Sequence, residues 1–198
     1  MDRKTTWQLD PAHSTIEFAV KHMMFTTVRG RFTTFSGTVQ VDEQNPNNSR
    51  VEVTIEAATI NTGVADRDAH LRTTDFLDVE RYPEILFRSR RVEGAHKKEG
   101  DRFRILGDLE IRGKAIPVIL DATFEGIGKD PWGKQRAGFA ARSEIDRRDW
   151  GLLWNQALET GGILVGNSVK IEIEAQAVAQ DDEAQLAGTA PSSTRASR

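Results

Sequence analysis

The sequence predicts an all-β domain of about eight antiparallel strands, and two observations support this prediction. Apolar and polar residues alternate with a period of two over many short stretches, as in VEVTIEA at residues 51–57. Such alternation is typical of strands with one buried face, whereas parallel strands buried on both faces are continuously apolar. Turn residues separate these stretches, so we expect strands at residues 5–9, 14–22, 31–41, 51–57, 85–92, 102–111, 115–124, 136–145 and 169–175.

The composition excludes several classes of protein. Lys and Arg number 27 and Asp and Glu number 30, a net charge of −3 without the basic excess of a general nucleic-acid binder. Cysteine is absent, which excludes disulfides, thiolate metal sites and cysteine nucleophiles. No apolar run reaches the length of a membrane helix, and residues 1–6 contain no signal-like apolar run. We therefore expect a soluble, cytoplasmic protein without an integral membrane segment.

The chain divides into one domain and a tail. The last 19 residues, 180–198, contain one Leu and four Ala among polar residues, Gly and Pro. Such a segment has no apolar face to bury, so we expect residues 180–198 to be disordered. Residues 1–179 form the predicted single domain.

Two segments interrupt the strand pattern. Thr62 precedes the run 64–71, which has acidic residues at its start, so we expect a short helix capped by Thr62. Residues 152–160 end at Gly161-Gly162 and predict either a second short helix or an irregular lid.

Eight or so strands close into a barrel or form a sandwich of two sheets. In residues 14–22 the alternation puts Ile16, Phe18, Val20 and His22 on the inner face and Glu17 on the outer face. Small inner residues beside large aromatic ones are consistent with solid packing and with a cavity lined by rings. The residue pattern leaves both alternatives open.

Several blocks, in order from Trp7 to Val178, resemble the YceI family of lipocalin-like, polyisoprenoid-binding proteins. Each block is weak alone, but their order is specific. Two positions depart mildly from the family pattern: Glu110 stands where Thr is usual, and Trp150 where Phe is commoner. The matching blocks include AHS at 12–14, FAVKHMM at 18–24, VRGRFTTFSG at 28–37, RDAHLRTTDFLD at 67–78, YPEILF at 82–87, GDLEIRG at 107–113 and RDWG at 148–151.

The resemblance implies one extended, antiparallel, lipocalin-like β-barrel with one or two short helices and an elongated apolar tunnel. It also implies a long isoprenoid lipid, a quinone or a polyprenyl phosphate, as partner, and we add a homodimer as an expectation. Inward residues would line the tunnel, and His22, Arg67 or Arg148 would meet the head group. The candidate ligand-binding residues are Ile16, Phe18, Val20, His22, Phe32, Phe35, Arg67, Phe87, Leu109, Leu120, Phe139 and Arg148.

Catalysis is the alternative interpretation. On a helix, Asp66 and His70 are neighbours four positions apart, so either this pair or His22 could serve an enzyme acting on a lipid or another small hydrophobic molecule. The closest His pair, His13 and His22, is nine positions apart, so we expect no metal site. Nucleophile-elbow, phosphate-loop and dinucleotide motifs are absent, and we expect no cofactor.

Overall fold

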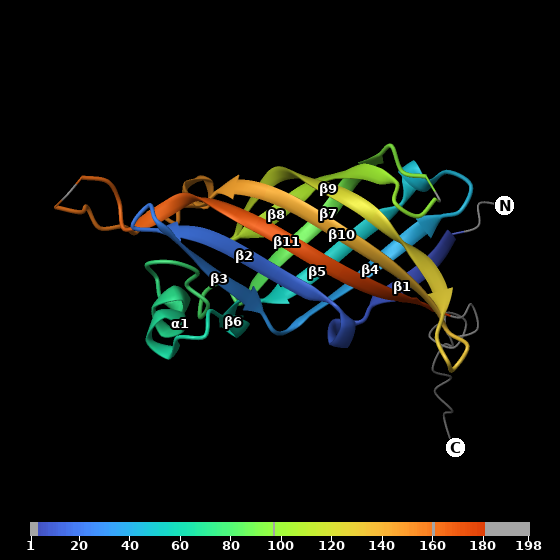
Figure 1. The fold of residues 1–198 in the computed structure, drawn as a ribbon, viewed down its shortest axis with the longest axis horizontal. Coiled ribbons are helices and arrows are strands. Elements are labelled where there is room, and N and C mark those ends of the chain that lie inside the picture. The colour runs from blue at the N-terminus through green and yellow to red at the C-terminus, as the bar shows by residue number, and fades with distance from the viewer. Residues whose placement is uncertain (1–3, 97, 160, 181–198) are drawn as a thin grey trace, which may run out of the picture.

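The computed structural model describes residues 4–96, 98–159 and 161–180, which form an elongated antiparallel barrel (Figure 1). Two-residue alternation folds into the pleated walls of this barrel, with one face of each strand turned inward. Its strands are β1 (Lys4–Leu9), β2 (Thr15–His22), β3 (Thr26–Phe32), β4 (Phe35–Asp42), β5 (Arg50–Glu56), β6 (Ile60–Asn61), β7 (Glu84–Glu93), β8 (Arg102–Ile111), β9 (Lys114–Lys129), β10 (Gln135–Asp146) and β11 (Val165–Ala179).

The eleven strands occupy eight strand positions around the barrel wall, here called staves, because three of these positions are each formed by two short strands. This confirms the predicted strand number. β1 pairs with β4 while β2 pairs with β3, so β1 and β2 are two halves of one stave, as are β3 and β4. β5 and β6 form another such pair, because they bond to β4 and β3 respectively. The long strand β11 closes the ring by pairing with β2 along its first part and with β1 near its end. Closure pairs the sheet edges that an open sheet would expose.

The prediction of a single strand over residues 31–41 is wrong, because the chain bends at Thr33 and Thr34 between β3 and β4. The neighbouring stave bends at the same level through the short 3-10 helix η3 (Ala57–Thr59). Backbone bonds from Thr33 N to Thr59 O (3.3 Å) and from Glu56 N to Thr34 O (3.0 Å) hold the two bends together. Phe32 and Phe35 therefore both face inward although they are three residues apart.

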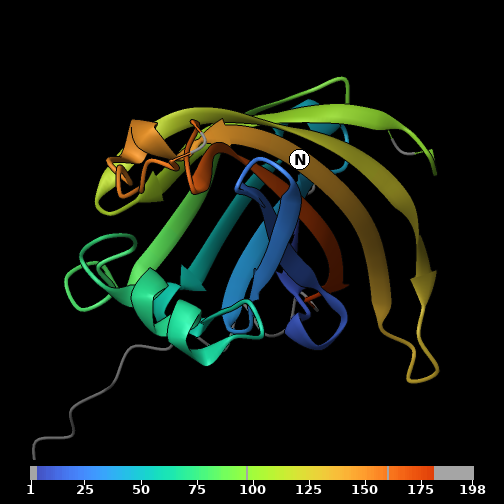
Figure 2. The ribbon, with the colours of Figure 1, turned by 60° about the vertical axis from the view of Figure 1, so that its left-hand side comes forward.

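One α-helix, α1 (Ala65–Arg72), covers one end of the barrel (Figure 2). The prediction that Thr62 caps it is wrong, because the helix begins after Val64, which provides no side-chain cap. Thr62 is instead held by Asp68, whose Oδ1 accepts bonds from Thr62 N (2.8 Å) and Thr62 Oγ1 (2.6 Å). The remaining short helices are the 3-10 turns η1 (Pro11–His13), η2 (Pro46–Asn48) and η4 (Arg147–Trp150).

The described residues of the segment 152–164 form no helix, so of the two predictions only the irregular form agrees with the structure. The Asn155 side chain ties this segment to the start of β11 by accepting from Val165 N (3.0 Å) and donating to Val165 O (2.7 Å). An isolated bridge pairs Ala157 with Ile163. The segment projects from the α1 end of the barrel (Figure 1).

The barrel interior is hollow rather than solidly packed. No large side chain in the described ranges is completely buried, although a cluster of apolar residues runs along the inside of the barrel. Phe18, Phe32, Ile171 and Ile173 face inward and pack against that cluster, yet each remains only half-buried. A solid core at native packing density would enclose such side chains fully.

Two further observations concern the predicted C-terminal tail and the expectation of no integral membrane segment. Gln180 N donates to Thr6 O (2.8 Å), so backbone pairing reaches one residue beyond β11. The rest of the predicted tail, residues 181–198, lies outside the described residues. Within the described part of the chain, no helix is both long and apolar enough to cross a membrane.

Candidate binding cavity

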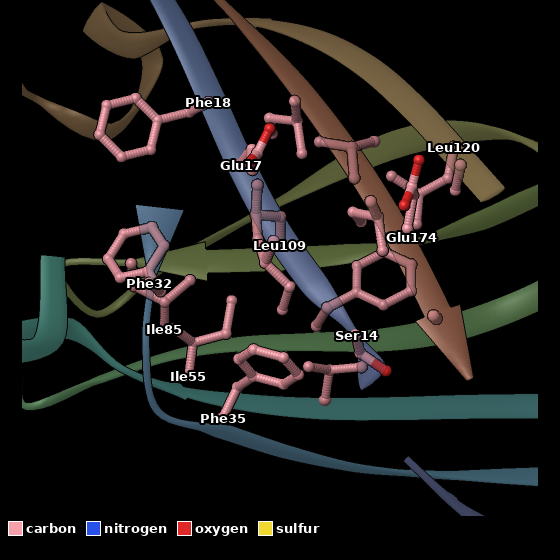
Figure 3. Close-up of a pocket in the computed structure, with 18 of the residues that line it drawn as sticks. Ser14, Glu17, Phe18, Phe32, Phe35, Ile55, Ile85, Leu109, Leu120 and Glu174 are labelled. Carbon is pink, nitrogen blue, oxygen red and sulfur yellow. The ribbon is translucent and has the colours of Figure 1, made fainter. Parts of the chain in front are cut away.

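A cavity of about 970 Å³ occupies the barrel interior (Figure 3). Its lining runs from His22 at the end of β2 and Arg67 on α1 to Pro46 and Gln135 near the opposite end. This volume is at the upper end of the range of about 300–1,000 Å³ that is usual for small-molecule sites. The shape of the barrel makes the cavity long, so it suits an extended ligand.

The wall of the cavity is overwhelmingly apolar because each stave contributes its inward-facing set of residues. Figure 3 shows Phe35, Ile55, Ile85 and Leu109, from four consecutive strands of the wall, converging on the same space as Phe18 of β2. Phe18 and Phe32 lie side by side, with ring centroids 5.9 Å apart. An apolar wall of this kind has few groups that could fix the position of a polar molecule, and it favours a hydrocarbon.

The structure brings eleven of the twelve predicted site residues to this cavity. The residues along its wall are Ile16, Phe18, Val20, His22, Phe32, Phe35, Arg67, Phe87, Leu109, Leu120 and Phe139. Glu17, expected on the opposite face of the same strand, is half-buried and also lies along the cavity (Figure 3).

Arg148 is the exception, and its predicted place at the cavity is corrected. Its guanidinium lies on the surface and donates to Asp146 Oδ2 at 2.5 Å, so an ion pair with the last residue of β10 holds it away from the interior. The bond from Arg148 lowers the pKa of Asp146 to about 2. Arg147 is the buried neighbour that reaches the cavity, and it donates to Gly166 O (2.9 Å) and to Leu152 O.

Arg67 is a cation that lines the α1 end of the cavity. Its Nε donates to Thr62 Oγ1 at 2.7 Å and its Nη2 donates to Thr62 O at 3.1 Å. Among the residues that the structure describes, no carboxylate lies within ion-pair distance of Arg67. Its charge is therefore available to an anionic group at the α1 end of the cavity.

The predicted pair of Asp66 and His70 does not form a contact. His70 Nε2 instead meets Asp75 Oδ2 at 2.8 Å, because the chain turns back after α1 and brings Asp75 to the imidazole. The His70 ring lies edge-on against Trp154, with centroids 4.7 Å apart, and against Phe76. In the described ranges no three His, Asp or Glu side chains gather in a way that could hold a metal ion.

Several lining residues were missed because they belong to irregular segments, where no period reveals the inward face. Phe76 and Leu77 follow α1, and Leu152 and Trp154 follow η4. Trp150 is buried and donates from Nε1 to Leu109 O at 3.0 Å. Their apolar character was the only signal in the sequence, and it does not by itself separate a cavity wall from a packed loop.

Comparison with known proteins identifies relatives with this architecture. The YceI-like domain family matches residues 7–177. A UPF0312 protein of Photorhabdus laumondii is 44% identical over 138 residues, 70% of each chain. Protein YceI of Escherichia coli O157:H7 is 41% identical over 140 residues, 71% of each chain.

Solved structures share the fold. BcnA of Burkholderia cenocepacia superposes with a TM-score of 0.73 at 23% identity, covering 85% of this chain and 98% of its own. A polyisoprenoid binding domain from Saccharophagus degradans, implicated in plant cell wall breakdown, gives 0.67 at 14% identity and covers 88% and 98%. The family match spans almost the whole barrel, from β1 to β11, and this chain therefore belongs to the YceI-like family.

Proposed function

We propose that this barrel binds a long isoprenoid lipid, such as an isoprenoid quinone or a polyprenyl phosphate, and stores or transports it without chemical change. The observation that carries the proposal is the long, hollow, apolar cavity of about 970 Å³. The fold shared with a domain described as polyisoprenoid-binding adds support.

The physical basis is the burial of hydrocarbon. Each CH₂ group removed from water contributes about 0.8 kcal/mol, so a long tail binds tightly without specific polar contacts. The tail would lie inside the barrel, in contact with Phe18, Phe35 and Leu109. The head group would lie at the α1 end, where Arg67 and His22 line the cavity.

Native extraction tests the proposal. The protein is purified without detergent, extracted with organic solvent, and the extract is analysed by lipid mass spectrometry. We expect an isoprenoid quinone or polyprenyl species in an amount comparable to the protein. Absence of any such species, together with failure of the empty protein to bind a purified polyprenyl lipid, would refute the proposal.

The catalytic alternative is supported by one contact, the 2.8 Å bond between Asp75 and His70, of which His70 lines the cavity. A carboxylate that orients an imidazole is a common arrangement for general acid–base chemistry. Incubation of the protein with the extracted lipid, compared with a His70→Gln variant, distinguishes the two functions. Turnover that the variant loses would favour an enzyme, and recovery of unchanged lipid would favour a carrier.

Two further expectations, a homodimer and a cytoplasmic location, stay predictions. A homodimer is checked by light scattering of the purified protein over a range of concentrations. The cytoplasmic location is checked by fractionation of cells that express the chain at its natural level.

A further inference from the structure

The α1 end of the barrel carries an apolar rim, formed by Met24 and Phe25 at the β2–β3 turn and Leu153 after η4. These side chains are 60%, 75% and 66% exposed. Large apolar side chains gathered at one end of a protein are typical of an interaction surface. The two contributing segments meet, because Met23 N donates to Leu164 O at 2.8 Å.

The backbone of the β2–β3 turn is unfavourable for the residues that occupy it. Met23 and Met24 have φ angles of 49° and 67°, and Phe25 N donates to His22 O at 3.2 Å. A two-residue turn with two positive φ angles favours Asn-Gly, because the β-carbon crowds the carbonyl oxygen in the left-handed conformation, a cost that Gly avoids and Asn offsets by local hydrogen bonds. Two methionines here strain the turn and expose apolar surface, so folding alone does not explain them.

The rim continues into the cavity. His22 and Leu164, which bond to the turn through their backbone oxygens, both line the cavity, and Trp154, next to Leu153, lines it as well. A hydrocarbon chain moving between the cavity and the rim would stay in contact with apolar side chains. The α1 end is thus a suitable exit for an apolar ligand.

The charge around the turn indicates the partner. The hairpin from Lys21 to Arg31 contains Lys21, Arg29 and Arg31 and no carboxylate of its own, and Arg29 lies 3.8 Å from Glu172 on β11. Lys21 Nζ lies 3.5 Å from Phe25 O, directly behind the rim. Apolar side chains backed by cations suit a lipid–water interface, where the side chains enter the acyl region and the cations meet phosphate groups.

We propose that the apolar rim docks the barrel onto the surface of a lipid bilayer, which supplies or receives the lipid held in the cavity. This inference rests on the proposed function and adds the partner from which the ligand comes. The rim side chains would enter the interface, with α1 and the segment after η4 lying against the bilayer.

The opposite end of the barrel provides a matched control. The β9–β10 hairpin exposes Trp132 by 82% and Ile127 by 59%, and Lys129 and Lys134 flank its turn. Tryptophan is common at membrane interfaces, so this hairpin is the competing docking site. A substitution at each end therefore identifies the end that binds.

The experiment measures co-sedimentation of the full chain with vesicles of phosphatidylcholine and phosphatidylglycerol. We expect Met24→Ser with Phe25→Ser to weaken vesicle binding by about tenfold or more, as loss of burial of two apolar side chains implies. Trp132→Ser should bind as the unchanged protein does. Weakening by Trp132→Ser alone, or by neither substitution, would overturn the proposal.

A second variant separates docking from folding. Met23→Asn with Met24→Gly gives the turn its preferred residues, so we expect a higher melting temperature together with weaker vesicle binding. A variant with a lower melting temperature and unchanged vesicle binding would show that the methionines serve the fold and would overturn the proposal.

Ligand binding by the cavity is measured separately, with a short, water-soluble isoprenoid in the absence of vesicles. We expect the Met24→Ser, Phe25→Ser protein to bind this probe with unchanged affinity. If the variant loses vesicle binding and keeps isoprenoid binding, the loss is due to the rim and not to the cavity. A protein that binds vesicles through the rim but no isoprenoid would refute the proposed function and leave the docking surface standing.

Discussion

The ring of Phe18 on β2 lies directly over Gly30 on β3, so closely that a β-carbon added to Gly30 would be 2.4 Å from Phe18 Cζ. Because Phe18 lines the cavity, this contact couples the packing of two neighbouring strands to the width of the cavity. Glycine at this position lets the ring lie against the wall rather than across the cavity.

Gly30→Ala should therefore push the Phe18 ring into the cavity. The added methyl group would also meet Thr62 Cγ2 at 2.9 Å. Since the Phe18 ring has open space to move into, we expect a loss of stability of about 1 kcal/mol, the low end for overpacking, and clearly weaker lipid binding. Gly107→Ala is the comparison, because its β-carbon would meet the backbone oxygen of Arg88 at 2.6 Å. Chemical denaturation should show a larger loss for Gly107→Ala; the reverse order would contradict the account.

Phe18→Trp tests the same position by adding bulk. In a hollow barrel the indole occupies space meant for the lipid tail, so we expect weaker binding and a melting temperature close to that of the unchanged protein. In a solid core the added bulk would cost about 1–3 kcal/mol. Glu172→Ala is the control, because Glu172 is exposed and pairs only loosely with Arg29 at 3.8 Å. Normal binding combined with strong destabilisation of the empty Phe18→Trp protein would place Phe18 in a packed core.

Head-group recognition is tested at Arg67. Arg67→Gln should weaken the binding of a polyprenyl phosphate by about tenfold or more, since a hydrogen bond to a charged group contributes roughly 1.5–3 kcal/mol. Binding of a neutral quinone with the same tail should change less. Arg148→Gln removes a cation held outside the cavity by Asp146, so both affinities should be unchanged. Equal losses for the two lipids would show that Arg67 does not meet the head group.

The far end of the barrel predicts a dependence of stability on pH. Arg136 donates to Asp130 Oδ2 (2.8 Å) and to Asp10 Oδ2 (2.6 Å), and these bonds lower the pKa of both carboxyls below the ordinary 3.8. A carboxyl whose pKa is lowered by folding stabilises the protein fully above its unfolded pKa. That stabilisation is lost as the pH falls below 3.8 through the folded values.

Arg136→Met should reduce this acid sensitivity. We expect the free energy of unfolding of the variant to fall less steeply below pH 3.8 than that of the unchanged protein, and denaturant titrations at several pH values measure the slopes. Arg142→Met, an exposed substitution on the same strand, should leave the slope unchanged. Identical slopes for the unchanged protein and Arg136→Met would contradict this origin of the acid sensitivity.

Truncation tests the predicted tail. A chain ending at Gln180 keeps the backbone bond to Thr6, so we expect its melting temperature to stay within about 2 °C of the full chain. Calorimetry of both proteins measures the difference. A large decrease would show that residues 181–198 contribute to folding.

The sequence predicted the apolar inward face of β2, although Glu17, expected on the outer face, also lies along the cavity. Ile16, Phe18 and Val20 follow strict alternation, and all three line the cavity. The alternation failed at Phe32 and Phe35, whose odd spacing requires the bend at Thr33. That bend depends on backbone bonds to a distant stave, which a local pattern does not contain.

The polar end of the site was less predictable from sequence. Adjacent Arg147 and Arg148 have opposite orientations, and only the path of η4 decides which one is buried. Asp75 reaches His70 because the chain reverses after α1, whereas helical spacing favoured Asp66. Both outcomes depend on tertiary contacts within irregular segments.

The affinity of the empty protein for a series of isoprenoids that differ only in tail length tests the central claim most directly. Because each buried CH₂ contributes about 0.8 kcal/mol, we predict that affinity rises steeply with every added isoprene unit until the tail fills the cavity, and then stays constant. Phe18→Trp should move the plateau to a shorter tail. Affinity that does not depend on tail length, or no binding at any length, would contradict the proposal that the barrel carries a long isoprenoid lipid.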